Sequence, residues 1–98
     1  MRNMSKNEKL VLQHLFSVFA TDICVQTFNS LSEALEITHR QAKTAVRALK
    51  RRGYAEHTAY WNEDGVLGGS GYEITVAGIW EIRTSTAAEA RLAEQPAL

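Results

Sequence analysis

One helical segment constrains the fold of this chain more than any other part of its sequence. Residues 38–52 contain no glycine or proline, so nothing in them interrupts a helix. Thr38 and Gln41 have the spacing of a capping box, in which each side chain accepts a hydrogen bond from the other residue's backbone amide. Gly53 follows at the position where a left-handed C-terminal cap is favoured. The pattern therefore predicts a helix over 38–52 with both of its ends defined.

The two sides of this helix differ in chemistry. With about 100° between successive residues, the side expected to face the core is small and apolar: Ala42, Ala45, Val46 and Leu49. The opposite side carries Arg40, Thr44, Arg47 and Arg51. Two boundaries separate the apolar side from the outward side: Lys43 and Lys50 lie along one of them, and Gln41 and Ala48 lie along the other. The inward alanines predict a helix that lies close to the rest of the domain and presents long donor side chains outward.

Charge is unevenly distributed along the chain, although 11 Lys and Arg residues balance 11 Asp and Glu residues overall. Six of the basic residues and none of the acidic residues fall within 38–53, which leaves five basic residues for the rest of the chain. A solvated helix face usually mixes both signs, because Glu beside Lys or Arg stabilises the helix. The segment therefore favours a polyanionic partner over the alternative of an ordinary solvated face.

The outward residue types match the groups that DNA presents in its major groove. Arginine can pair with guanine through two hydrogen bonds, glutamine can pair with adenine, and a small side chain allows contact with a thymine methyl. Lys43, Lys50 and the arginines near the helix end can neutralise backbone phosphates. We therefore expect sequence-specific binding of double-stranded DNA through a basic recognition helix at 38–52.

Local signals place further elements before this helix. Ser5 and Glu8 have the spacing of another capping box and start a helix with a broad apolar stripe. Residues 23–28 are β-branched and aromatic, which predicts a short strand. Residues 29–30 then offer a cap for a short helix over 31–35.

A hairpin and a last helix are expected after it. Residues 54–61 are rich in aromatic side chains and predict a strand. Residues 62–71 contain four glycines and predict a mobile connection to a partner strand over 72–75. Thr75 can cap the last helix, in which Gly78 costs about 1 kcal/mol relative to alanine.

Three stretches have patterns that occur together in one known family. They are 31–38, a short helix and turn; 39–54, a helix ending in Leu-x-x-x-Gly; and 72–78, with the pattern Tyr-x-Ile-Thr-x-x-Gly. Together they resemble the winged helix-turn-helix superfamily, most closely the small MarR-like regulators of bacteria and phages. The resemblance covers about residues 8–83 and implies an α+β fold with a three-helix core, a β-hairpin wing and a C-terminal helix.

The resemblance also implies which side chains meet DNA. Those in the groove would be Arg40, Gln41, Lys43, Thr44 and Arg47, and phosphate contacts from Lys50 and Arg51 complete the expected DNA-binding set. Residues 62–71 would be the wing. Wings that enter the minor groove usually carry Arg or Lys at the tip, whereas this one carries Glu63 and Asp64, which phosphates repel. The sequence therefore leaves contact between the wing and DNA open.

Regulators of this kind commonly act as homodimers, because one recognition helix reads only a few base pairs and two-fold symmetry doubles the site. The candidate interface consists of spare apolar surface on the first helix, together with Ile79, Trp80 and Leu92. The alternative is that Phe16, Phe19 and Trp80 complete the core of a monomer. Both possibilities remain open from the sequence.

Length and composition exclude several other classes. The 98 residues fit one domain, which we place at 1–84, followed by a helical extension or flexible tail at 85–98. No apolar run approaches the roughly 18 residues of a membrane span, and no signal-peptide core follows the N-terminus, so we expect a soluble cytoplasmic protein. Cys24 is expected to be a buried small hydrophobe.

No chemistry-bearing motif points to an enzyme. The three histidines have no metal-binding spacing, and the Ser, His and acidic residues form no nucleophile motif. We therefore expect no catalytic residue, metal or cofactor, and leave any small-molecule effector open. The main alternative function is a protein-interaction winged helix whose basic face binds an acidic partner protein. The neutral total charge and the acidic wing favour this alternative.

Overall fold

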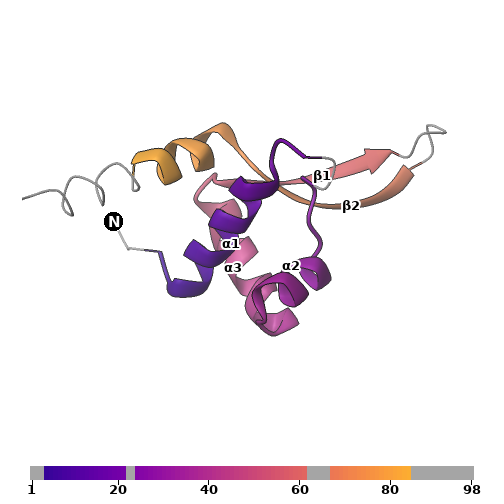
Figure 1. Ribbon diagram of the computed structural model, residues 1–98, viewed down its shortest axis with the longest axis horizontal. Helices are drawn as coiled ribbons and strands as arrows, with labels where there is room; N and C mark the ends of the chain where they lie inside the picture. The colour runs from indigo at the N-terminus through magenta and orange to yellow at the C-terminus, as the bar shows by residue number, and fades with distance from the viewer. Residues whose placement is uncertain (1–3, 22–23, 62–66, 85–98) are drawn as a thin grey trace, which may run out of the picture.

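The computed structural model describes residues 4–21, 24–61 and 67–84. Its elements are α1 (Lys6–Val18), α2 (Phe28–Leu35), α3 (His39–Arg51), β1 (Ala55–Trp61), β2 (Leu67–Ile74) and a helix over 76–84. Figure 1 shows the labelled helices clustered together, with the β1–β2 hairpin projecting to one side and 76–84 on the other. This arrangement confirms the expected α+β architecture. Among the residues described, no helix is both long and apolar enough to span a membrane.

The core lies where α1, α2 and α3 meet. Its fully buried large side chains come from all three helices: Val11, Leu12, Leu15, Leu31, Val46 and Leu49. Ala55 of β1 and Ile74 of β2 join this cluster from the hairpin. Ala42 and Ala45 are buried as well, and their small side chains allow α3 to lie close to its neighbours, as the helical pattern predicted.

Both ends of α3 form as the sequence predicts. The Thr38 hydroxyl accepts a hydrogen bond from the Gln41 amide at 3.0 Å, and the Gln41 side-chain oxygen accepts one from the Thr38 amide at 2.9 Å. Gly53 has a φ of 82°, the left-handed conformation that favours glycine. Ala48, expected at an exposed edge, is only 6% exposed, so that prediction was wrong. The reason is that α3 packs against both α1 and α2, which widens its buried arc.

The capping box expected at the start of α1 forms only in part. The Ser5 hydroxyl accepts a hydrogen bond from the Glu8 amide at 3.2 Å. The Glu8 side chain is buried, and its Oε2 lies 3.4 Å from Nε of Arg52. The reciprocal half of the capping box was therefore a wrong prediction, because the carboxylate is directed to an opposite charge at the end of α3.

The strand expected over 23–28 is reduced to one bridge in the residues described there. Gln26 and Tyr72 pair antiparallel through two backbone hydrogen bonds of 2.8 Å. A Cβ on Gly71 would lie 2.6 Å from the Gln26 carbonyl oxygen, so glycine permits this close approach. The bridge attaches the segment between α1 and α2 to the hairpin.

The start of α2 also differs from the expectation. Thr27 is its N-cap and forms a capping box with Ser30, so the helix begins at Phe28. A cap at 29–30 with a helix over 31–35 was therefore wrong. The Thr27 hydroxyl accepts a hydrogen bond from the Ser30 amide at 3.0 Å, which starts the helix before the position that the apolar pattern suggested.

The second strand is longer than the expected 72–75. β2 begins at Leu67, and its glycine-rich part pairs with β1: Gly71 opposite Thr58, Ser70 opposite Ala59, and Gly69 opposite Tyr60. The mobile connection was therefore wrong for 67–71, because glycine keeps both backbone hydrogen-bonding groups and can pair in a ladder. Residues 62–66, which include Glu63 and Asp64, lie outside the described part, as does the expected extension at 85–98.

The last helix begins at the expected cap but needs its glycine. Thr75 Oγ1 accepts a hydrogen bond from the Gly78 amide at 3.1 Å. A Cβ on Gly78 would lie 2.5 Å from the Tyr54 carbonyl oxygen and 2.7 Å from Cγ1 of Ile74. The expected cost of about 1 kcal/mol counted helix propensity alone. It missed that the helix crosses the Tyr54 backbone too closely for a side chain.

Candidate nucleic-acid interface

The residues predicted to bind DNA all lie on α3. Six of them are exposed: Arg40, Gln41, Thr44, Arg47, Lys50 and Arg51. Lys43 is half-buried. From Arg40 to Arg51 the helix rises roughly 16 Å, at about 1.5 Å per residue. The fold therefore presents basic groups along the length of one helix, which is the arrangement that the sequence predicted.

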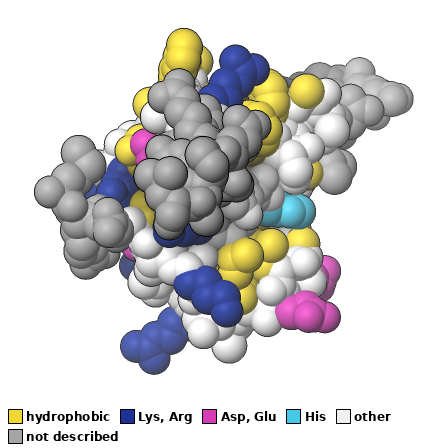
Figure 2. All heavy atoms as spheres, turned by 60° about the vertical axis from the view of Figure 1, so that its left-hand side comes forward, with side chains coloured by type: hydrophobic (Ala, Val, Ile, Leu, Met, Phe, Trp, Pro, Cys, Tyr) yellow, Lys and Arg dark blue, Asp and Glu magenta, His cyan; other side chains and the backbone are white. Residues whose placement is uncertain are grey.

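Acidic side chains are absent from α3 itself. The nearest ones along the chain on its N-terminal side, Glu33 and Glu36, are exposed on α2 and on its C-terminal cap. In Figure 2, basic side chains project at the lower left of the molecule, and an acidic group stands apart at the lower right. Because no carboxylate lies within the helix, the outward surface of α3 keeps its positive charge available to an anionic partner.

Gln41 has a structural task in addition to its predicted contact with a base. Its side-chain oxygen accepts the Thr38 amide hydrogen bond at 2.9 Å, while the side chain remains exposed. Bidentate pairing with adenine needs both the oxygen and the nitrogen of the amide. An amide oxygen has two lone pairs and can accept two hydrogen bonds, so Gln41 can cap α3 and still offer both its nitrogen and its oxygen to a base.

Arg52 points away from the outward surface of α3. Its side chain is 18% exposed, and its Nε lies 3.4 Å from the buried Glu8 carboxylate. The sequence counted Arg52 among six bases of one basic segment, whereas the fold leaves five on α3: Arg40, Lys43, Arg47, Lys50 and Arg51. Nothing in the sequence indicated this pairing, because Glu8 and Arg52 lie far apart along the chain and the Ser5-x-x-Glu8 pattern indicates only a capping box.

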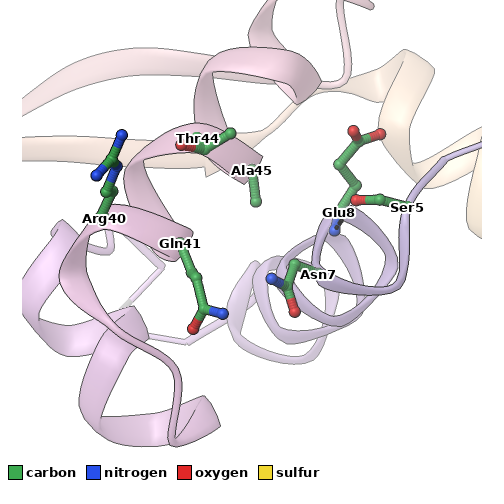
Figure 3. A pocket seen from close by; sticks show the side chains of 7 residues that line it. All are labelled: Ser5, Asn7, Glu8, Arg40, Gln41, Thr44 and Ala45. Carbon is green, nitrogen blue, oxygen red and sulfur yellow. Dashed lines mark hydrogen bonds between the residues drawn. The ribbon is translucent and has the colours of Figure 1, made fainter.

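A hollow of about 230 Å³ separates the first turn of α1 from the N-terminal half of α3. Ser5, Asn7 and Glu8 line it from α1 and the preceding residue, and Arg40, Gln41, Thr44 and Ala45 line it from α3. Figure 3 shows the Gln41 and Asn7 side chains directed toward one another across the space, while Arg40 points away from it. Ser5 and Asn7 are thus neighbours of the basic helix α3 that the sequence did not indicate, because contact between α1 and α3 is a tertiary feature.

Aromatic contacts fix the hairpin relative to α2 and α3. The Phe28 ring of α2 stacks on Tyr72 of β2, with ring centres 5.4 Å apart, and meets His39 of α3 edge-on at 5.5 Å. His57 of β1 meets the Tyr72 ring edge-on, with ring centres 5.2 Å apart. These four rings, which the sequence did not link, place the hairpin beside the start of α3.

Two smaller expectations concern Cys24 and metal binding. Cys24 is a free thiol and is half-buried, rather than fully buried as the sequence suggested. Within the described ranges, no cluster of three His, Cys, Asp or Glu side chains is arranged to hold a metal ion.

Solved structures with a similar fold come from MepR of Staphylococcus aureus. A MepR variant from a multidrug-resistant clinical isolate matches with a TM-score of 0.75 and 15% identity, covering 93% of this chain and 61% of that one. MepR itself, a transcription regulator of the multidrug efflux pump MepA, matches with a TM-score of 0.69 and 18% identity, covering 97% and 67%. A MepR–DNA complex matches with a TM-score of 0.65 and 16% identity, covering 93% and 68%.

The chain spans about three-fifths of the length of the first of these structures. No protein-family model matches it, and no curated protein sequence does. At such low identity the likeness concerns the fold, and MepR is a MarR-family winged-helix regulator. In this architecture α2 and α3 are the helix-turn-helix, and β1 and β2 form the wing. The chain therefore has the MarR-like winged helix-turn-helix fold.

Proposed function

We propose that this chain binds double-stranded DNA through α3 and acts as a transcriptional regulator in the form of a homodimer. One observation carries the proposal: α3 presents five basic side chains and no acidic one on a helix whose opposite side is buried in the core. This is the arrangement that an inserted recognition helix requires. The protein would act by binding, without catalysis.

The side chains of α3 divide into two roles in this proposal. Arg40 and Arg47, both exposed, would pair with base edges in the major groove, and Thr44 between them allows close approach. The phosphate-binding role falls to Lys43, Lys50 and Arg51. Gln41 would pair with a base through its exposed side-chain amide, whose oxygen also caps the helix. Phosphate contacts would position the helix, and the few central side chains would specify sequence.

The similar solved structures support the proposal that this chain is a DNA-binding regulator. One matched MepR structure is a complex with DNA, another is bound to an oligodeoxyribonucleotide, and a third is described as a transcription regulator. These are properties of MepR. The same fold in this chain, combined with its own basic helix, makes DNA the partner that the surface chemistry favours.

The helix over 76–84 is the candidate dimer surface. Val76 and Trp80 lie one turn apart on it and are 71% and 64% exposed. Ile79, also suggested by the sequence, packs against the core and contributes less free surface. Leu92 lies outside the residues described. We place the DNA-binding domain at 1–84, followed by a helical extension or flexible tail at 85–98.

A mobility-shift assay with random-sequence duplex at low salt tests the proposal. We expect retardation by the native protein, because phosphate contacts alone support non-specific binding. Arg40→Ala and Arg47→Ala should each weaken binding to a selected duplex by about 1–3 kcal/mol, while circular dichroism shows an intact fold. Lys9→Ala removes one exposed positive charge from α1 and is the matched control. Full affinity in both arginine variants would refute the assignment of α3.

The second candidate is a module that binds an acidic partner protein through the same surface. The zero net charge of the chain favours it, since long-range attraction to DNA is modest when acidic and basic residues balance. No retardation of random duplex by the native protein at low salt would favour this function over DNA binding.

A further inference from the structure

The end of α3 and the start of the helix over 76–84 are joined by direct backbone contacts. We call Gly53, Tyr54, Thr75 and Gly78 the helix joint. The Thr75 amide donates to the Tyr54 carbonyl at 3.0 Å, and the Thr75 hydroxyl donates to the Gly53 carbonyl at 2.6 Å. The same hydroxyl oxygen accepts from the Gly78 amide at 3.1 Å. One threonine side chain therefore connects the segment that ends α3 to the first turn of the later helix.

Gly78 allows the two segments of the joint to touch. A Cβ there would lie 2.5 Å from the Tyr54 carbonyl oxygen, well inside van der Waals contact. That oxygen belongs to the backbone and is already held by Thr75, so it cannot move aside as a side chain could. Any larger residue at position 78 must therefore displace the helix over 76–84 relative to α3.

The joint is continuous with α3 on one side and with the later helix on the other. The Tyr54 amide donates to the Leu49 carbonyl at 2.9 Å, and Gly53 between them adopts its left-handed conformation. The Tyr54 hydroxyl donates to the Glu81 carboxylate at 3.3 Å. A continuous series of hydrogen bonds therefore links the buried side of α3 to the second turn of the helix over 76–84. This series fixes the angle between the two helices.

We propose that the helix joint determines the spacing between the two DNA half-sites that the dimer reads. This inference rests on the proposed function, in which the helix over 76–84 forms the dimer interface and α3 enters the groove. Two-fold symmetry converts a displacement at the joint into opposite displacements of the two recognition helices. Half-sites on one face of DNA lie roughly 34–36 Å apart, and each base pair advances about 3.4 Å. Thr75 and Gly78 are positioning residues and do not contact DNA themselves.

Selection from a pool of random duplexes tests this role. The native protein should recover an inverted repeat with one dominant spacing. Gly78→Ala should recover the same half-site sequence, because α3 is unchanged, but with a spacing that is altered or scattered over several base pairs. Thr75→Val should act in the same direction, and Thr75→Ser, which keeps the hydroxyl, should restore the native spacing. Recovery of the native spacing by both Gly78→Ala and Thr75→Val would overturn the proposal.

Gly53→Asn is the matched control within the joint. A Cβ at Gly53 meets no atom within 4 Å, so this substitution perturbs the left-handed cap without moving the helices. We expect reduced thermal stability with native spacing. A spacing change as large as that of Gly78→Ala would show that general destabilisation, rather than displacement at the joint, alters the spacing, and would count against the proposal.

A measurement without DNA separates failure of this inference from failure of the proposed function. Spin labels at Lys50→Cys and Arg83→Cys, both exposed, report the distance between α3 and the later helix in a Cys24→Ser background. We expect Gly78→Ala to shift or broaden the distance distribution. An unchanged distribution refutes the joint as a determinant of geometry, whatever the DNA result. If the native protein enriches no sequence, the proposed function fails, and the label distances still decide whether the joint fixes the helices.

Discussion

Arg52 and Arg51 are both arginines of the basic segment, and the fold predicts opposite consequences for their removal. Arg51 is exposed on α3, whereas the Arg52 side chain is 18% exposed and pairs with Glu8, which is 5% exposed, at 3.4 Å. Breaking a fully buried ion pair costs roughly 3–5 kcal/mol, because it leaves one buried charge without its partner. Arg52 is partly solvated, so we expect Arg52→Met to lower the free energy of unfolding by about 1–3 kcal/mol.

The effects on DNA binding should be reversed. Each phosphate neutralised contributes about 0.9 to the slope of log affinity against log salt concentration, so the three bases proposed to bind phosphates contribute at most about 2.7 per subunit. Arg51→Ala should therefore reduce the slope by about 0.9 and leave the free energy of unfolding within about 0.5 kcal/mol of the native value. Arg52→Met should leave the slope unchanged, because its charge faces Glu8 rather than the outward surface.

Urea unfolding measures the first quantity, and fluorescence anisotropy of a labelled duplex between about 50 and 200 mM salt measures the second. A double-mutant cycle with Glu8→Gln should give a coupling energy above about 0.5 kcal/mol between positions 8 and 52. If Arg52→Met reduces the salt slope as much as Arg51→Ala does, Arg52 faces DNA and the reasoning is refuted. Additive effects of Glu8→Gln and Arg52→Met on stability would equally refute the ion pair as a stabilising contact.

Three further predictions concern the core, the helix joint and the dimer. Leu31→Ala should lower the free energy of unfolding by about 2–5 kcal/mol, because the side chain is fully buried, while Glu33→Ala on the same helix should change it by less than about 0.5 kcal/mol in urea titrations. Burial, followed by the charge and hydrogen bond of Glu81, raises the pKa of Tyr54 above its ordinary 10.0. The protonated Tyr54 hydroxyl therefore stabilises the fold below about pH 10, and this contribution is lost as the pH rises through the raised pKa. The free energy of unfolding should consequently fall less above about pH 10 in Tyr54→Phe than in the native protein; an equal fall in both proteins would contradict the raised pKa. Trp80→Arg should leave the melting temperature nearly unchanged but shift sedimentation toward the monomer, because the side chain is 64% exposed in the single chain; an unaltered dimer would exclude this helix face as the interface.

Most features that depend on neighbours in the sequence were predicted correctly, although the local Thr27–Ser30 cap of α2 was missed. The capping box at Thr38, the left-handed Gly53 and the buried side of α3 all formed as expected, because caps and helical periodicity involve residues at most a few positions apart. The winged-helix arrangement was implied by the resemblance of residues 31–38, 39–54 and 72–78 to the winged helix-turn-helix superfamily, and the fold confirms it. The seven proposed DNA-binding side chains remain a prediction; the fold leaves six of them exposed and Lys43 half-buried.

Features that depend on distant partners could not be predicted. Glu8 was assigned to a local cap because its partner Arg52 is far away along the chain. Gly71 was assigned to a mobile connection, although Thr58 opposite holds it in a strand and the Gln26 backbone passes too close for any Cβ. Ala48 was placed at an open edge, because a helical wheel does not show that α3 packs against two helices at once.

Residue types and their helical period were enough to predict one basic, well-capped helix with a small apolar side and a long cationic side. How that helix is held depends on contacts between distant parts of the chain. Folding turns Arg52 inward to Glu8 and brings Gly78 against the Tyr54 carbonyl. Both contacts join atoms that meet only after the chain has folded. Close contacts between distant backbone segments leave no pattern in the sequence from which they could be predicted.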